Sequence, residues 1–325
     1  MKFPTLLFLS SLAVGLKLVA QENQLNKILE NLKVELVQPE TISTKDFEFG
    51  TSVSPDGNEF FFVKGLPRFG RTVIVYCKWK DASWSPPLVA QFSGKYNDTN
   101  PYFSKDGKRL YFTSDRPSQN PNIQGRNFWY VERTTHGWSE PKVVPGSIND
   151  QYDIVYPTIQ LDRTVHFVSW NRPDSQNGDI YVSKFKNGTY TSPELVEELN
   201  TTSSDADPEL SNDGQLMFLT STREGGLGHY DLYVFKKKTN GKWGKAINLG
   251  NQVNSNRMDS DPILSPDGQT LYFSSDRLAY PDVSKQTYAN YGDIRSFYNQ
   301  ILNGAMNIYK VDISELLSFL KETDF

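Results

Sequence analysis

Short apolar segments recur along the chain at a nearly constant interval, and each follows a tight turn. The segments are apolar on both faces, as at Leu110 to Thr113 and Leu216 to Thr220, which is typical of fully buried β-strands. The turns read Ser-Pro-Asp-Gly or a variant of it, and Asp-Gly is a strong hairpin signal. Their spacing of about fifty residues is the length of one propeller blade. The turn aspartates are Asp56, Asp106, Asp162, Asp213 and Asp267.

Each copy of the repeat contains four predicted strands. An innermost strand leads into the turn, a second strand follows it, and a third strand opens with Asp-Ile-Tyr or a similar triplet. An outer strand then follows an aromatic residue, which usually has proline three positions later. The repeat therefore predicts an all-β fold, a five-bladed β-propeller of four-stranded antiparallel blades. The predicted blades cover residues 48–93, 98–147, 154–199, 205–253 and 259–313.

Two features of the ends of this repeat predict how the ring closes. The last copy has no outer strand, whereas residues 33–39 before the first copy resemble the outer strands of the other copies. The N-terminal strand is therefore expected to complete the last blade, which removes an open sheet edge. The third turn, Gln160 to Arg163, is the one degenerate copy of the turn motif.

The motifs Ser-Pro-Asp-Gly, Leu-Tyr-Phe-x-Ser-Asp-Arg, Asp-Ile-Tyr and Trp-x-x-Pro resemble the TolB-like, WD40-like β-propeller repeat family of bacterial envelope proteins. The resemblance covers residues 33–313. It implies the propeller fold, but the family includes partner-binding envelope proteins, peptidase propellers and modules of unknown role, so it implies no single activity. Residues 314–325 are expected to be a short tail, and no family catalytic residue carries over.

The N-terminus resembles a secretory signal. A charge at Lys2 precedes an apolar run over residues 3–16, and the small residue Ala20 precedes a polar stretch. We therefore expect a signal peptide over residues 1–20, a lead segment over 21–32, and export to the periplasm or beyond, with a retained N-terminal anchor as the alternative. No later segment is long and apolar enough for a membrane helix, so the mature chain is not expected to insert into a membrane.

The net charge limits the classes of partner that are expected, and the cysteine content excludes an intramolecular disulfide. The formal net charge is -4 and no basic run is present, which argues against nucleic acid. Cys77 is the only cysteine, so no intramolecular disulfide can form. No cofactor is expected, and nothing in the sequence supports Ca²⁺ in particular. An envelope protein or a saccharide is the expected partner.

Candidate site residues gather on one face, here called the upper face, which carries the start of each innermost strand and the loops between second and third strands. The acids there could form a ring that binds a cation, a basic peptide or a sugar. Alternatively, each aspartate caps a turn or pairs with a repeated arginine, as a residue that recurs with the repeat usually does. The candidates are Asn100, Arg116, Tyr156, Asp205, Asp207, Arg223, His229, Asp259, Asp261 and Arg277.

The largest departure from the repeat is the loop from Leu278 to Met306. It contains Tyr288, Tyr291 and Tyr298, and its apolar residues fall at helical spacing, which predicts a short helix on the upper face. That helix could plug the channel or form a groove for a partner, and the two interpretations stay open here.

Motifs for catalysis are weak. The three histidines form no metal-ligand cluster, and the sequence has no nucleophile elbow, phosphate loop or dinucleotide fingerprint. The sequence therefore favours a non-catalytic binding or scaffold module, with no catalytic residue and no metal site assigned. The alternative is a glycan-active hydrolase or lyase that uses carboxylates at the channel mouth. Asp207 and Asp261 occupy equivalent positions in neighbouring blades and could form the required pair.

Overall fold

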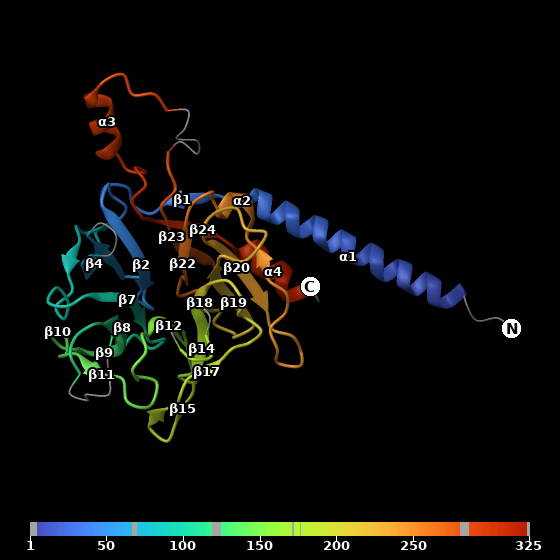
Figure 1. Cartoon of the computed structure of the whole chain (residues 1–325), viewed down its shortest axis with the longest axis horizontal. Coiled ribbons are helices and arrows are strands. Elements are labelled where there is room, and N and C mark those ends of the chain that lie inside the picture. Colours follow the sequence, from blue (N-terminus) through green and yellow to red (C-terminus); the bar gives the residue numbers. More distant parts are fainter. Residues whose placement is uncertain are drawn as a thin grey trace.

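The computed structural model describes residues 5–66, 70–118, 125–170, 172–175, 177–279 and 286–323, with side chains from residue 15 onward. Antiparallel sheets of four or five strands surround a common axis, so the predicted five-bladed β-propeller is confirmed (Figure 1). In each blade the first three strands run in chain order from the axis outward, and in the last blade the outer strand is β1 (Val34–Leu36) from the start of the chain.

The first two blades each carry a short extra strand at the rim. Blade 1 contains β2 (Phe47–Val53), β3 (Glu59–Gly65), β4 (Thr72–Lys80), β5 (Ser83–Trp84) and β6 (Leu88–Val89). Blade 2 contains β7 (Asp98–Phe103), β8 (Arg109–Ser114), β9 (Asn127–Thr134), β10 (Gly137–Trp138) and β11 (Lys142–Val143).

The other three blades have four strands each. Blade 3 contains β12 (Val155–Ile159), β13 (Val165–Ser169), β14 (Asp179–Ser183) and β17 (Glu194–Leu195), with a hairpin of β15 (Phe185–Lys186) and β16 (Thr189–Tyr190). Blade 4 contains β18 (Asp205–Leu210), β19 (Leu216–Ser221), β20 (Asp231–Lys236) and β21 (Ile247–Asn248). Blade 5 contains β22 (Asp259–Leu264), β23 (Thr270–Ser275), β24 (Asn307–Asp312) and β1 (Val34–Leu36).

Stacking of neighbouring blades explains why the second strands are apolar on both faces. On β3, the ring of Phe60 lies 5.5 Å from that of Tyr272 in blade 5. The next residue, Phe61, points the other way, and its ring lies 5.3 Å from that of Phe103 in blade 2. Because successive side chains of a strand alternate between its faces, one strand contributes to the cores on both sides of its blade.

The N-terminal strand closes the ring as predicted. β1 pairs antiparallel with β24, with Val34 opposite Val311 and Leu36 opposite Tyr309. The last blade is therefore built from both ends of the repeat region, and β1 supplies its fourth strand.

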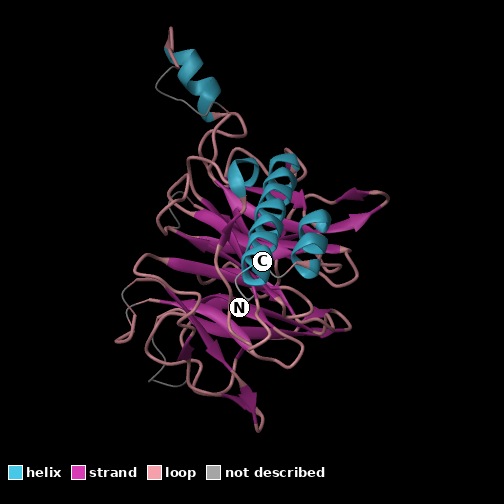
Figure 2. Cartoon of the chain, turned by 90° about the vertical axis from the view of Figure 1, so that its right-hand side faces the viewer, coloured by secondary structure: helices cyan, strands magenta, loops and turns pink. Residues whose placement is uncertain are grey.

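The segments on either side of the propeller are helical, which the sequence analysis does not predict. α1 (Thr5–Asn31) includes the segment expected to be a signal peptide and extends away from the body at its N-terminal end, while α4 (Ser314–Glu322) replaces the expected short tail (Figures 1 and 2). α1 also contacts α2 (Gly250–Val253). The side chains that α1 and α4 bury in one core with blades 4 and 5 include Leu25, Ile28, Leu29, Leu32, Leu316, Phe319 and Leu320.

None of the helices described is long and apolar enough to cross a membrane. The expected signal cleavage after Ala20 falls inside α1, upstream of the residues that pack against α4. Cleavage there would leave the packed part of the helix attached to the propeller. The signal peptide itself stays a prediction.

The helical layer predicts a measurable contribution to stability. Leu316 is completely buried, so Leu316→Ala should lower the free energy of unfolding by about 2–4 kcal/mol through lost burial and a residual cavity. Ser318→Ala, on the exposed face of the same helix, should change it by less than about 0.5 kcal/mol. Urea unfolding of both variants tests this, and equal effects would contradict the packing described.

Candidate functional site

Each of the three repeated arginines is bound to a carboxylate at the start of an innermost strand, and two of these carboxylates, Asp205 and Asp259, are predicted site residues. In blade 4, Arg223 lies 2.5 Å from Asp205, and it also donates to the backbone carbonyl of Leu199 at 3.0 Å. The carboxylate of Asp205 is fully buried. Each pair therefore joins an innermost strand to the preceding outer segment. The equivalent pairs, both at 2.6 Å, are Asp98–Arg116 and Asp259–Arg277.

The other two blades replace this pair with different residues. In blade 3, Arg172 lies 2.9 Å from Asp150, and in blade 1, Lys64 lies 2.7 Å from the buried Glu48. Every blade thus has an acid–base pair at its upper end. These contacts support a structural role for Asp205, Asp259, Arg116, Arg223 and Arg277.

A second set of residues surrounds the axis. Each innermost strand contributes one residue at a bulge, where its register with the second strand shifts. All five have a positive φ, between 51° and 58°, which costs non-glycine residues conformational energy. We call this set the axial ring: Gly50, Asn100, Tyr156, Asp207 and Asp261.

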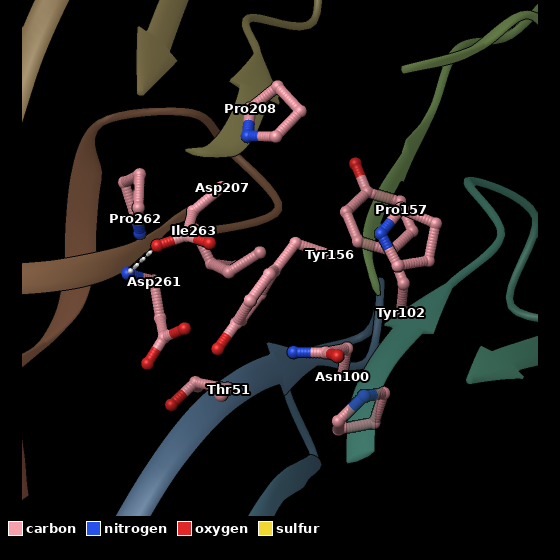
Figure 3. A pocket seen from close by; sticks show the side chains of 12 residues that line it. Thr51, Asn100, Tyr102, Tyr156, Pro157, Asp207, Pro208, Asp261, Pro262 and Ile263 are labelled. Carbon is pink, nitrogen blue, oxygen red and sulfur yellow. Dashed lines mark hydrogen bonds between the residues drawn. The ribbon is translucent and has the colours of Figure 1, made fainter. Parts of the chain in front are cut away.

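Neighbouring blades are connected through the axial ring. The backbone N–H of Asp261 donates to the Asp207 carboxylate at 3.2 Å (Figure 3). The N–H of Gly50 in turn donates to the hydroxyl of Ser274, on the strand that supports Asp261, at 3.2 Å. The ring therefore also closes the structure at its centre.

The second strands match the chemistry of the ring residues that they support. Thr113 donates to the side-chain oxygen of Asn100 at 3.1 Å. A hydroxyl also lies beside each of the two ring carboxylates, from Thr220 for Asp207 and from Ser274 for Asp261. The corresponding residues behind Gly50 and Tyr156 are Val63 and Val168. At Asn100, Asp207 and Asp261, the innermost strand thus supplies the ring residue and the second strand supplies a hydroxyl beside it.

Several polar atoms of the ring lack a partner. The side chains of Asn100, Asp207 and Asp261 are no more than 6% exposed. Within the described part of the chain, Asn100 Nδ2, Asp207 Oδ1 and Asp261 Oδ1 meet no hydrogen-bond partner. They border a cavity of about 20 Å³ on the axis, and the Tyr156 hydroxyl faces the same space (Figure 3). The cavity has room for about one water molecule.

Burial raises the pKa of both carboxyl groups, and the charge of Asp261 adds to this effect at Asp207. Burial raises the pKa of Asp261 to about 6. Burial, and then the charge of Asp261, raise the pKa of Asp207 well above its usual value. The lining of the cavity includes no basic side chain that would offset the two charges. Burial followed by the charges of Asp261 and Asp207 also raises the pKa of Tyr156.

A third buried carboxylate, Glu209, crosses the axis below the cavity. It accepts from the Thr158 hydroxyl at 2.9 Å and from the Leu264 N–H at 3.2 Å. Thr158 also bonds to the hydroxyl of Tyr102 at 3.1 Å, so this network connects blades 2 to 5. Burial is the main cause that raises the pKa of Glu209. The sequence does not single out this residue, because the bulge between Ala206 and Glu209 interrupts the alternation of the strand.

The remaining candidates lie away from the axis. His229 is exposed beside Tyr230. The predicted short helix forms in the long loop as α3 (Tyr291–Tyr298), and Asn290 and Asp293 form a capping box at its start. It projects from the propeller and buries none of its residues (Figures 1 and 2). The interpretation of this helix as a channel plug is therefore wrong. Residues 280–285 of the loop lie outside the described residues.

Metal binding finds no support in the arrangement of side chains. Among the residues that the structure describes, no group of three or more His, Cys, Asp and Glu side chains could hold a metal ion.

The similarity to known proteins lies in the fold. No protein-family model and no curated protein matches the chain. The α-L-arabinofuranosidase from Lactobacillus brevis matches at 13% identity over 83% of this chain and 92% of that one, with a TM-score of 0.50. TolB from Acinetobacter baumannii matches at 18% identity over 82% of this chain and 55% of that one, with a TM-score of 0.45.

A protein described as TolB from Agrobacterium tumefaciens also matches, at 15% identity over 71% of this chain and 70% of that one, with a TM-score of 0.46. The chain spans just over half the length of the Acinetobacter TolB. TolB structures are thus among those that this chain resembles, and at these identities the likeness extends to the fold alone.

The axial ring predicts an unusual dependence of stability on pH. Because Asp261 has a pKa of about 6 when folded and 3.8 as its ordinary value, the folded state binds its proton more tightly. Stability should therefore fall as the pH rises from about 4 to about 6. Asp261→Asn removes this loss and should raise the free energy of unfolding at pH 7 by roughly 1–3 kcal/mol, with no gain near pH 4.

The matched control lies two residues earlier on the same strand. Asp259 is paired with Arg277, so Asp259→Asn should destabilise the protein at pH 7 by about 3–5 kcal/mol. Urea unfolding at several pH values separates the two. A loss of stability at pH 7 in both variants would contradict the electrostatics of the ring.

Proposed function

We propose that this protein is a non-catalytic binding module of the bacterial envelope that captures a protein or saccharide partner on its upper face. The observation that carries the proposal is the arm of residues 286–305, whose helix α3 buries none of its residues. Tyr291 and Tyr298 are 73% and 66% exposed. Tyrosines supply large contact areas at low entropic cost, so they are frequent in binding surfaces.

A groove at the base of the arm extends this surface. It has a volume of about 800 Å³ and lies between the end of α3 and the upper loops of blade 1. Phe47, Leu66 and Val73 contribute apolar walls, and Lys45 and Arg71 contribute charge. Leu66 is 59% exposed. A partner could therefore contact the arm and the body of the propeller at once.

The features of the axial ring favour a binding role over a purely structural role. Its residues have strained backbones, and its carboxylates are buried without basic partners. Strain and buried charge reduce stability, and proteins retain such features where they serve a site. The ring lies at the centre of the face that carries the arm.

Glycan cleavage is the second candidate function, and the buried pair of Asp207 and Asp261 favours it. Raised pKa values are what a general acid requires. The size of the cavity weighs against this function, because about 20 Å³ does not admit a sugar ring. One oxygen of Asp207 is also occupied by the Asp261 N–H. The enzyme would therefore need to open the channel before it could act.

The binding proposal predicts a loss of partner capture without a loss of folding. Tyr291→Ala combined with Tyr298→Ala removes exposed rings only, so the unfolding midpoint should not change. Recovery of a cross-linked envelope partner should fall at least about tenfold, as for hot-spot residues. The control Leu88→Ala with Val89→Ala removes exposed apolar side chains from the rim of blade 1. Equal recovery with wild type and both double variants would contradict the proposal.

The enzymatic alternative predicts turnover that depends on one carboxyl group. If the ring is catalytic, purified protein should cleave a member of a broad glycan panel, and Asp261→Asn should reduce the rate at least about a hundredfold. Reducing-end release and product chromatography measure both. Cleavage that persists in Asp261→Asn, or no cleavage of any glycan by the wild type, counts against it.

A further inference from the structure

A basic basin lies between blades 2 and 3 on the lower face, opposite the axial ring. It has a volume of about 650 Å³, within the range of small-molecule sites. The basin is formed by the hairpin turns after β7 and β12 and by the end of β9. Its basic lining residues are Lys105, Lys108, Arg109, Arg133 and Arg163, and its acidic ones are Asp106 and Glu132.

The degenerate turn of blade 3 places an arginine in this basin at a conformational cost. The other four blades have glycine at this turn position, with φ between 67° and 75°. Arg163 has φ 67° and donates its N–H to the Gln160 carbonyl, as each glycine does to the first residue of its turn. Glycine adopts this conformation freely, whereas arginine does so with strain. The substitution is therefore not explained by the repeat.

The guanidinium of Arg163 is held in place. It stacks on Phe185, with 3.4 Å between its central carbon and the ring centroid. It also lies beside the hydroxyl of Tyr190, a side chain that is 1% exposed. That hydroxyl has no hydrogen bond of normal geometry in the described structure. A guanidinium fixed in this way is suited to bind an oxyanion, because its N–H groups can donate to the oxyanion in pairs.

Two of the five basic side chains of the basin are in ion pairs, Arg109 with Glu132 and Arg133 with Glu59. Glu132 is shared by Arg109, at 2.9 Å, and Lys142, at 2.6 Å. Lys105 donates to the neutral side-chain oxygen of Asn212 at 2.9 Å and lies over the ring of Tyr102, and its charge also acts on the buried Glu209. The structure records no ion pair for Arg163 in its described part. Positive charge thus remains in the basin although the whole chain carries a formal net charge of -4.

The acidic residue nearest the turn of blade 2 is also occupied. The Asp106 carboxylate accepts from the Ser104 hydroxyl at 2.6 Å and from the Lys108 N–H at 3.0 Å. These bonds hold it in the hairpin turn. Leu161, 76% exposed, adds an apolar surface at the edge of the basin. A ligand there meets positive charge together with a small apolar contact.

We propose that this basin binds an acidic saccharide through a carboxylate or sulfate group, with Arg163 and Arg109 as the principal anion contacts and Leu161 against the sugar ring. Arginine donates in pairs to such groups, and the basin has the size for one or two sugar residues. This site is separate from the upper face, so it does not depend on the function proposed there.

Arg163→Gly is the sharpest test, because it restores the residue that the other four blades have at this turn. The variant should be at least as stable as wild type, since the backbone strain is relieved. Wild-type protein should bind D-glucuronate and glucose 6-sulfate by calorimetry, both sugars should raise its unfolding temperature, and neutral glucose should do neither. Arg163→Gly and Arg109→Gln should each weaken binding about tenfold or more.

The control Arg295→Gln removes a charge from the arm on the upper face and should bind both acidic sugars as wild type does. The proposal is overturned by any of four results. The first is no binding of either acidic sugar to wild type, and the second is equal binding of glucose. The third is an affinity of Arg163→Gly that equals wild type. The fourth is an equal loss in Arg295→Gln, which would show unspecific attraction by net charge.

Discussion

Closure of five blades around one axis is the constraint on which the rest of the structure depends. A second strand that is apolar on both faces is buried only if a blade stands on each side of it, as Phe60 and Phe61 show for blade 1. No blade can therefore be stable alone, and the last one must be completed by β1 from the other end of the chain. The helical layer of α1 and α4 then covers the blades next to this closure.

The same constraint brings the innermost strands so close that their side chains meet at the axis. Below the cavity this contact is fully satisfied, because Glu209 accepts from Thr158 and Leu264. At the axial ring it is not, since Asp207 and Asp261 each retain an oxygen without a partner. The two levels of the channel thus differ. The Glu209 network connects blades through satisfied hydrogen bonds, whereas the axial ring leaves polar atoms without a partner beside a small cavity. Only the second has the character of a site.

The sequence predicts the parts of this molecule that the repeat specifies. The blades, the hairpin turns and the closing strand can be predicted from spacing and strand patterns, because the same turn and the same buried strands recur in every copy of the repeat. The chemistry at the axis follows less well. Asp205 and Asp207 are equally acidic in the sequence, yet Asp205 forms an ion pair with Arg223 and Asp207 forms none in the described structure. The bulge between Ala206 and Glu209, which places Asp207 at the axis, makes the difference. α4 was missed because a short amphipathic segment has no repeat to support its interpretation.

Residues that depart from the repeat need an individual explanation, because the repeat itself does not account for them. A repeated aspartate or arginine has a structural reason in each blade, so its chemistry alone is weak evidence for function. The glycine of the turn is the opposite case: four blades agree on it for a backbone reason, and Arg163 is present despite that reason. The arm departs from the repeat in the same way, since α3 adds exposed tyrosines without any buried contact of its own. A departure from the repeat that reduces stability or adds nothing to it requires another explanation. Binding of a partner or ligand explains both the arginine at position 163 and the exposed tyrosines of the arm.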